Sequence, residues 1–107
     1  MAVAGKFSPE VLRRRWVHSH EEDTPGEIVF RPEDFHFPPS RGRRSFELKA
    51  DGTLVEAGPG PVDRREHRHG VWRLEGDELV FCDASAGPPR QRLRIAAAER
   101  DRLVLRK

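Results

Sequence analysis

Short stretches in which hydrophobic and polar residues alternate occupy most of this chain, and turn-forming residues separate them. The clearest example runs through 46–48, a turn at Asp51-Gly52, and a second apolar stretch at 54–55. An Asp-Gly or Gly-Asp step between such stretches is typical of a β-hairpin. The same arrangement recurs at 16–18 with 28–30, at 72–74 with 79–81, and at 93–95 with 103–105. This pattern predicts four hairpins, or about eight strands of roughly four to six residues.

A meander of short strands exposes its edges unless the sheet closes on itself. We therefore expect an all-β fold, a small up-and-down barrel or half-open cup, formed by residues 1–107 as a single domain. A short helix should begin at Ser8-Pro9-Glu10, because Ser is a good N-cap and Pro fits the first helical position. Strand side chains alternate between two faces, which predicts one buried set. That set is Phe46, Leu48, Trp72, Leu74, Leu93, Ile95, Leu103 and Leu105.

Two connections are unusually long for a barrel of this size. Residues 31–44 carry three prolines, so they cannot form a central strand, and residues 57–68 are rich in Gly and Pro before becoming charged. Such loops either act as lids or binding loops, or they cross an end of the barrel, and the pattern leaves both open. Phe35 and Phe37 have equal parity, so they either pack under the rim or form an apolar lid.

Composition limits the core and the class of partner. Hydrophobic residues make up 36% of the 107 positions and charged residues another 36%, so the core must be thin. Cys82 is the only cysteine, which excludes an intrachain disulfide framework and makes a small core residue the usual role. The net charge is +2 with acids and bases interleaved, which argues against a nucleic-acid partner.

Nothing in the chain indicates a membrane partner. The longest apolar run is far short of the ~20 residues that a spanning helix needs. The first residues, MAVAGKFSPEVL, lack the charged start and apolar stretch of a secretion signal, which predicts a cytoplasmic location. The pattern does not indicate an oligomeric state.

Four strings of residues carry a likeness to a known group of barrels. They are Leu12-x-x-x-Trp16, Phe46-x-Leu48-x-x-Asp51-Gly52, Gly70-x-Trp72-x-Leu74 and Leu103-Val104-Leu105. Together they resemble the lipocalin-like, or calycin-type, small bacterial barrels. The resemblance implies a ligand cup, and an early Trp that packs against an Arg of the last strand. Arg102 and Arg106 are the candidates for that arginine.

Four of the five histidines form two His-x-His pairs, His18 with His20 and His67 with His69. On a strand such a pair points both imidazoles to one face, the arrangement that a metal site requires. The hairpin parity places the first pair inward and the second outward, unless a bulge at Gly70 shifts the register. We therefore expect no metal site and no cofactor.

His18 occupies the slot that hydrocarbon side chains fill in the other hairpins. An inward polar group must find a partner or line a wet cavity. It is either a core histidine bonded to a neighbour, or a cavity-lining donor or proton shuttle. The carboxylates at 21–23 are close enough in sequence to orient it, although such a run is more often a solvated loop.

Arg41, Arg43 and Arg44 end the proline-rich connection. Guanidinium groups suit carboxylates or phosphates, although such a cluster also keeps an edge strand soluble. Our preferred interpretation is a cytoplasmic small-molecule binding module that holds a partly apolar, perhaps anionic ligand. Its expected ligand-binding residues are Trp16, His18, His20 and Trp72 in the cup and Arg41, Arg43 and Arg44 at its mouth.

Two other classes of function stay open. One is a small-barrel isomerase or cyclase in which His18 is the acid/base, and the other is a protein-interaction module that pairs through a strand edge or the arginine-rich loops. A carboxylate within hydrogen-bond reach of His18 in a cavity favours the enzyme. A filled core favours the interaction module.

Overall fold

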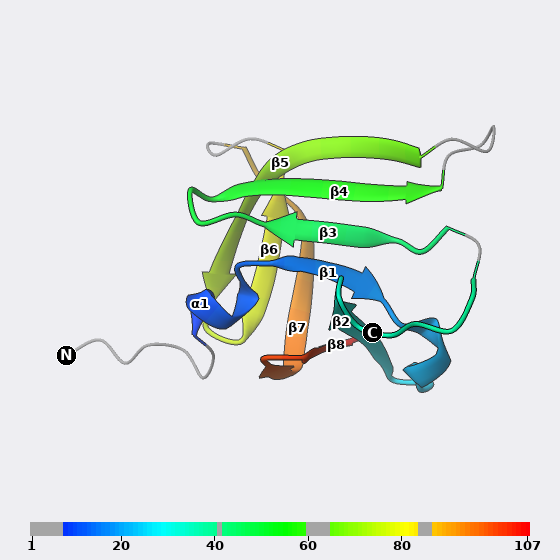
Figure 1. Ribbon diagram of the computed structural model, residues 1–107. Coiled ribbons are helices and arrows are strands. Elements are labelled where there is room, and N and C mark those ends of the chain that lie inside the picture. Colours follow the sequence, from blue (N-terminus) through cyan, green and yellow to red (C-terminus); the bar gives the residue numbers. More distant parts are fainter. Residues whose placement is uncertain (1–7, 41, 60–64, 84–86) are drawn as a thin grey trace.

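The computed structural model describes residues 8–40, 42–59, 65–83 and 87–107. Over these residues, eight antiparallel strands close into a barrel (Figure 1). A short helix, α1 (Pro9–Leu12), precedes the strands, and a single 3-10 turn, η1 (His20–Glu22), follows the first of them. The strands are β1 (Arg15–His18), β2 (Glu27–Pro32), β3 (Ser45–Leu48), β4 (Thr53–Pro59), β5 (Arg65–Glu75), β6 (Glu78–Cys82), β7 (Pro89–Glu99) and β8 (Arg102–Arg106).

All four expected hairpins are present. β1 pairs with β2, β3 with β4, β5 with β6, and β7 with β8. Gly52 and Gly76 occupy two of the turns with φ of 91° and 62°. This left-handed region is easily reached by glycine, which explains the turn signals at these positions.

The described parts of the connection expected at 57–68, residues 57–59 and 65–68, are strand. Ala57 and Gly58 belong to β4 and pair with His67 and Glu66 of β5. The pairing of β4 with β5 therefore extends well beyond the apolar residues of these strands. β5 and β7 each contain 11 residues, which is longer than the expected strands. The prediction was wrong here because the backbone pairing of these strands continues through polar residues, beyond the end of the hydrophobic core.

The order of strands departs from a simple up-and-down sequence at one place. β1 lies between β2 and β3, and β2 pairs with β8 to close the barrel. Since β2 and β3 are both antiparallel to β1, they run in the same direction. The proline-rich connection between them must therefore return along the barrel, and Figure 1 shows it passing around the end where β1 finishes.

The core fills the barrel at the end nearest α1. Leu12 of α1 is fully buried there, and Trp16 donates its indole N–H to the Leu12 carbonyl at 3.1 Å. Ser8 caps the helix as expected, accepting from the Glu10 N–H at 3.3 Å. Apolar side chains from all round the barrel complete this core, namely Leu48, Leu54, Trp72, Leu79, Phe81, Ile95, Leu103 and Leu105.

Six of the eight side chains expected in the core are buried, and Cys82 is buried as well. The predictions for Leu74 and Leu93 are wrong in part, because these side chains are only partly buried against the core. Leu74 lies next to the turn at Gly76, and Leu93 faces the cavity described below. The guanidinium over the Trp16 ring belongs to Arg14, at 5.6 Å from the ring centre, and not to the last strand.

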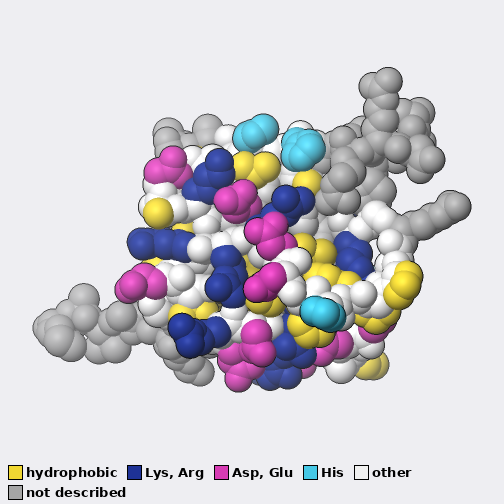
Figure 2. Space-filling view, viewed as in Figure 1, with side chains coloured by type: hydrophobic (Ala, Val, Ile, Leu, Met, Phe, Trp, Pro, Cys, Tyr) yellow, Lys and Arg dark blue, Asp and Glu magenta, His cyan; other side chains and the backbone are white. Residues whose placement is uncertain are grey.

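The outer surface of the barrel carries paired charges. Figure 2 shows acidic and basic side chains mixed across one face of the molecule. Arg92 of β7, for example, donates to Glu75 and Glu78 at 3.1 Å each. Among the described residues, no helix is both long enough and apolar enough to cross a membrane.

Candidate functional site

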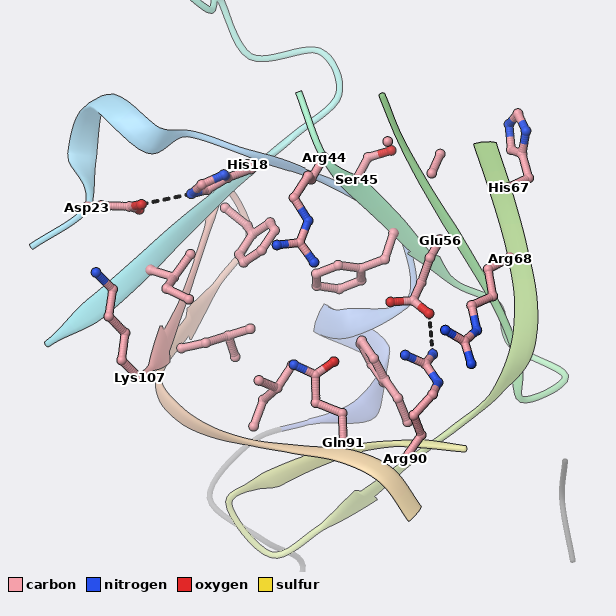
Figure 3. Close-up of a pocket in the computed structure, with 18 residues that line it drawn as sticks. His18, Asp23, Arg44, Ser45, Glu56, His67, Arg68, Arg90, Gln91 and Lys107 are labelled. Carbon is pink, nitrogen blue, oxygen red and sulfur yellow. Dashed lines mark hydrogen bonds and ion pairs between the residues drawn. The ribbon is translucent and has the colours of Figure 1, made fainter. Parts of the chain in front are cut away.

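A cavity of about 630 Å³ occupies the end of the barrel away from α1 (Figure 3). Its apolar wall consists of Ile28, Phe30, Phe46, Phe81, Leu93 and Leu105. Polar and charged residues border it from five strands and the adjoining segments: His18, Asp23, Arg44, Ser45, Glu56, His67, Arg68, Arg90, Gln91 and Lys107. The barrel is thus filled at one end and hollow at the other.

Strand alternation explains this division. On β4 the inward row runs from Leu54 in the core to Glu56 in the cavity, two residues further along. On β5 the same row runs from Trp72 through Gly70 to Arg68. The inward face therefore changes from hydrocarbon to charge as the strands leave the core.

One wall of the cavity is a chain of paired charges. Arg90 of β7 bonds Glu56 of β4, and its Nε donates to Asp83 at 3.0 Å. Arg68 of β5 donates to the same Asp83 oxygen at 3.1 Å. Two guanidinium groups and two carboxylates balance, so this wall ties strands together without leaving a net charge.

The opposite wall carries cations without such partners. In Figure 3 the side chain of Arg44 points into the cavity, whereas Lys107 lies at its edge on the same side as Asp23, and neither makes an ion pair with any described residue. The stem of Arg44 lies beside Gly58, where an added Cβ would be 3.7 Å from Arg44 Cγ. This is an ordinary contact distance, so the Arg44 stem packs along β4 at this position.

His18 faces the cavity and is held by a carboxylate. Its Nε2 lies 2.8 Å from Asp23 Oδ2, and both side chains are 21% exposed. Asp23 Oδ1 accepts the Val29 backbone N–H at 2.9 Å. The Phe30 ring packs against the imidazole with centroids 5.4 Å apart. The expectation that a nearby carboxylate orients His18 is confirmed, and the residue is Asp23.

Two of the expected ligand-binding residues, His18 and Arg44, line the cavity together. The two tryptophans do not. Trp16 and Trp72 lie in the filled end, 0% and 8% exposed, and Trp72 donates its indole N–H to the Lys49 carbonyl at 2.9 Å. Parity correctly placed both side chains inward, but it carries no information on depth along the barrel axis.

His20 and Arg43 also lie outside the cavity, and Arg41 falls outside the described residues. β1 ends at His18, so His20 belongs to η1, where its exposed ring contacts Ser40 Oγ at 3.1 Å. Arg43 precedes β3, and the alternation of side chains directs it outward. Its guanidinium bonds both oxygens of Glu21, at 2.9 and 2.6 Å, and the His18 carbonyl at 3.0 Å.

These contacts fasten the proline-rich connection to η1. Arg43 stacks on Phe37 and Arg31 on Phe35, each with 4.7 Å from Cζ to the ring centre, and the two rings meet edge to face at 5.0 Å. Of the described residues at 31–44, only Arg44 lines the cavity. The connection therefore crosses an end of the barrel, and its two phenylalanines pack with arginines rather than covering the opening.

Hydrogen bonds from arginines lower the pKa values of the two glutamates of η1. The hydrogen bond from Arg43 lowers the pKa of Glu21 from 4.5 to about 2. Arg31 does the same for Glu22, donating to both its oxygens at 2.8 and 2.7 Å, and its pKa is also about 2. The carboxylates at 21–22 are structural ion pairs, not part of the cavity.

The second His-x-His pair faces outward, as expected. The pairing of β4 with β5 continues without a shift through Gly70, and both His67 and His69 are exposed. His67 borders the cavity rim, where Figure 3 shows its imidazole pointing away from the opening. Over the described ranges, no three His, Cys, Asp or Glu side chains gather in an arrangement that could hold a metal.

Sequence reasoning missed the charged wall formed by Glu56, Arg68 and Arg90. The signal was present for two of them, since Glu56 has the parity of Leu54 and Arg68 has that of Trp72. Arg68 fell within the connection expected at 57–68 and Glu56 followed the apolar stretch at 54–55, so parity was not extended to either residue. Arg90 follows a turn whose length the pattern does not specify.

Comparisons of this chain with protein-family models, curated proteins and solved structures found no match.

Proposed function

We propose that this protein is a binding module for a small, partly apolar anion, which occupies the open half of the barrel. The observation that carries the proposal is Arg44, a guanidinium directed into an apolar-walled cavity with no acidic partner in the described chain. The resemblance of the sequence to lipocalin-like barrels is consistent with a ligand cup, and the closed eight-strand barrel supports it.

The balance of charge favours an anion. Arg68 and Arg90 are neutralised by Glu56 and Asp83, so the remaining charged lining residues are two cations, Arg44 and Lys107, and one carboxylate, Asp23. Arg44 and Lys107 are both solvent-exposed at this end of the barrel, so they can meet an anion that enters the cavity from solvent. A carboxylate, sulfonate or phosphate group fits the guanidinium fork.

The apolar wall favours a ligand with a hydrocarbon part. Phe30, Phe46 and Phe81 form a continuous series of edge-to-face rings, with centroids 4.9 and 5.4 Å apart. The volume of about 630 Å³ lies within the ~300–1,000 Å³ of most small-molecule sites. Pairing through a strand edge is less favoured, since closure leaves no unpaired strand in the described barrel.

Two fluorescent probes of similar shape test the proposal. Anilinonaphthalene sulfonate is aromatic and anionic, whereas N-phenylnaphthylamine is aromatic and neutral. We expect the wild-type protein to bind both, and Arg44→Gln to raise the dissociation constant of the sulfonate by about 10-fold, equivalent to the loss of one charge-assisted hydrogen bond. The neutral probe should bind the variant as well as it binds the wild type.

Arg73→Gln is the matched control, because Arg73 lies on the outer face of β5 and pairs with Glu75 at 2.9 Å. It should leave both dissociation constants unchanged. Equal affinity of wild type and Arg44→Gln for the sulfonate, with circular dichroism showing both folded, would contradict an anion site at Arg44.

A further inference from the structure

We propose that the His18–Asp23 pair transfers protons, and that the cavity converts a small keto acid to its enol. This inference rests on the proposed function, because the cavity must first hold the anionic substrate. It assigns the pair a catalytic role and names the class of substrate. Three features of the wall carry it: a fixed imidazole, a free ring nitrogen and a neighbouring cation.

Asp23 determines which nitrogen of His18 carries the proton. Its Oδ1 already accepts the Val29 N–H at 2.9 Å, and an ionised carboxylate only accepts hydrogen bonds. The 2.8 Å contact of Oδ2 with Nε2 is therefore a hydrogen bond donated by Nε2–H. In the neutral imidazole the lone pair is then on Nδ1, the nitrogen that can accept a proton.

Nδ1 makes no hydrogen bond to any residue in the described ranges. The ring nevertheless has a fixed orientation, because Asp23 holds one edge and Phe30 packs at 5.4 Å against its face. The other histidine nearby is His20, which belongs to the exposed turn η1. Its ring centroid lies 6.0 Å from that of His18. A base that is oriented, borders a cavity and keeps one nitrogen unbonded is suited to proton transfer.

Arg44, the residue before β3, lies across from His18. Val17 pairs with Ser45, and the His18 N–H donates to the Arg44 carbonyl at 2.8 Å, so the two residues are neighbours in the wall. Both side chains face inward, and facing side chains on paired strands start from Cβ atoms only ~5 Å apart. A substrate carboxylate or enolate oxygen held by Arg44 would therefore lie close to the imidazole.

The reaction needs no other reagent. His18 Nδ1 removes a proton from the carbon next to the keto group, and the electron pair of that C–H bond forms the C=C bond of an enolate. The negative charge moves to the keto oxygen, where Arg44 stabilises it. The imidazolium then gives its proton to that oxygen, which yields the enol and restores neutral His18.

Phenylpyruvate is a suitable probe, because it combines an aromatic ring, a carboxylate and an acidic C–H beside a keto group. In deuterium oxide, proton NMR follows the exchange of its methylene protons. We expect wild-type protein to accelerate exchange above the buffer rate, and His18→Gln to reduce the protein-catalysed rate by about 100-fold. His20→Gln, a change in the neighbouring exposed histidine, should retain the wild-type rate.

Asp23 is a positioning residue, and its role has its own readout. Asp23→Asn should slow exchange by about 10-fold and also change the tautomer of His18. The amide oxygen would accept the Val29 N–H, so the amide NH2 would face Nε2 as a donor and leave the ring proton on Nδ1. Nitrogen-15 NMR of the imidazole reports the tautomer, and a merely structural role for Asp23 would lower the rate without changing it.

Displacement of anilinonaphthalene sulfonate by phenylpyruvate separates the two proposals. If phenylpyruvate displaces the probe but exchange equals the buffer rate, or is unchanged in His18→Gln, proton transfer by His18 is wrong and the binding module stands. If the sulfonate does not bind wild-type protein at all, the proposed function is wrong, and the inference that rests on it is wrong too.

Discussion

His18 and Arg44 lie side by side in the wall of the cavity, joined by the 2.8 Å hydrogen bond from the His18 N–H to the Arg44 carbonyl. They are neighbours only because β1 lies between β2 and β3. In a simple up-and-down order β1 would instead pair with the last strand. The exchange of two strands thus brings an imidazole and a guanidinium together in one apolar-walled space.

Gly70→Ala should destabilise the barrel. A Cβ at this position would lie 2.3 Å from the Cys82 carbonyl oxygen, which is backbone and cannot rotate away. We expect a loss of about 1–3 kcal/mol in the free energy of unfolding, as for other overpacked sites. Denaturant melts measure it, with Gly26→Ala as control, since nothing lies within 4 Å of a Cβ there. Equal stability of the two variants would contradict the close packing of β5 on β6.

Leu79→Ala should cost more stability than Leu74→Ala. Leu79 is 0% exposed in the filled end, whereas Leu74 is partly buried at the edge of the same core. Truncating a fully enclosed leucine costs about 2–5 kcal/mol, and a partly exposed one costs less. Chemical denaturation of both variants checks this order, and the reverse order would contradict the enclosure of Leu79 in the core.

Stability should fall as the pH drops from ~4.5 toward ~2. The pKa of Glu21 and that of Glu22 are lowered from 4.5 to about 2 by their arginine partners, so the folded state binds fewer protons than the unfolded chain in this range. The stabilisation is complete above the unfolded value and is lost as each carboxylate becomes protonated. Melting temperatures across this range measure the loss.

The double variant Glu21→Gln with Glu22→Gln should flatten this part of the stability profile. Glu27→Gln, a glutamate at the start of β2, is the control and should keep the wild-type slope. An unchanged slope in the double variant would mean that other carboxylates carry the acid sensitivity.

The hairpins could be predicted because their signals are local. Gly52 and Gly76 are needed by the backbone of their own turns, and the apolar alternation on each side fixes which face is inward. The position of β1 between β2 and β3 could not be predicted this way. It rests on the long-range pairing of β1 with β3, for example Trp16 with Phe46, which no local signal specifies.

The candidate site was predicted only in part for a related reason. Parity placed His18 inward, and nearness in the sequence identified the carboxylates at 21–23. In the structure, Asp23 is the one that contacts His18. Parity also placed Trp16 and Trp72 inward, but both lie in the filled end that α1 closes. Which end of a barrel is filled depends on the helix and on the volumes of all strands together, and no single segment specifies it.

The most direct test of the anion-binding cavity is chemical-shift mapping on isotopically labelled protein titrated with anilinonaphthalene sulfonate. The largest shifts should fall on the Arg44 side-chain Nε–Hε and on the backbone amides of Phe30, Phe46 and Phe81, all of which line the cavity. They should be lost from Arg44 when the neutral N-phenylnaphthylamine replaces the sulfonate. Shifts confined to outward-facing residues such as Val17, Val55 and Val71, with none at Arg44, would contradict the account.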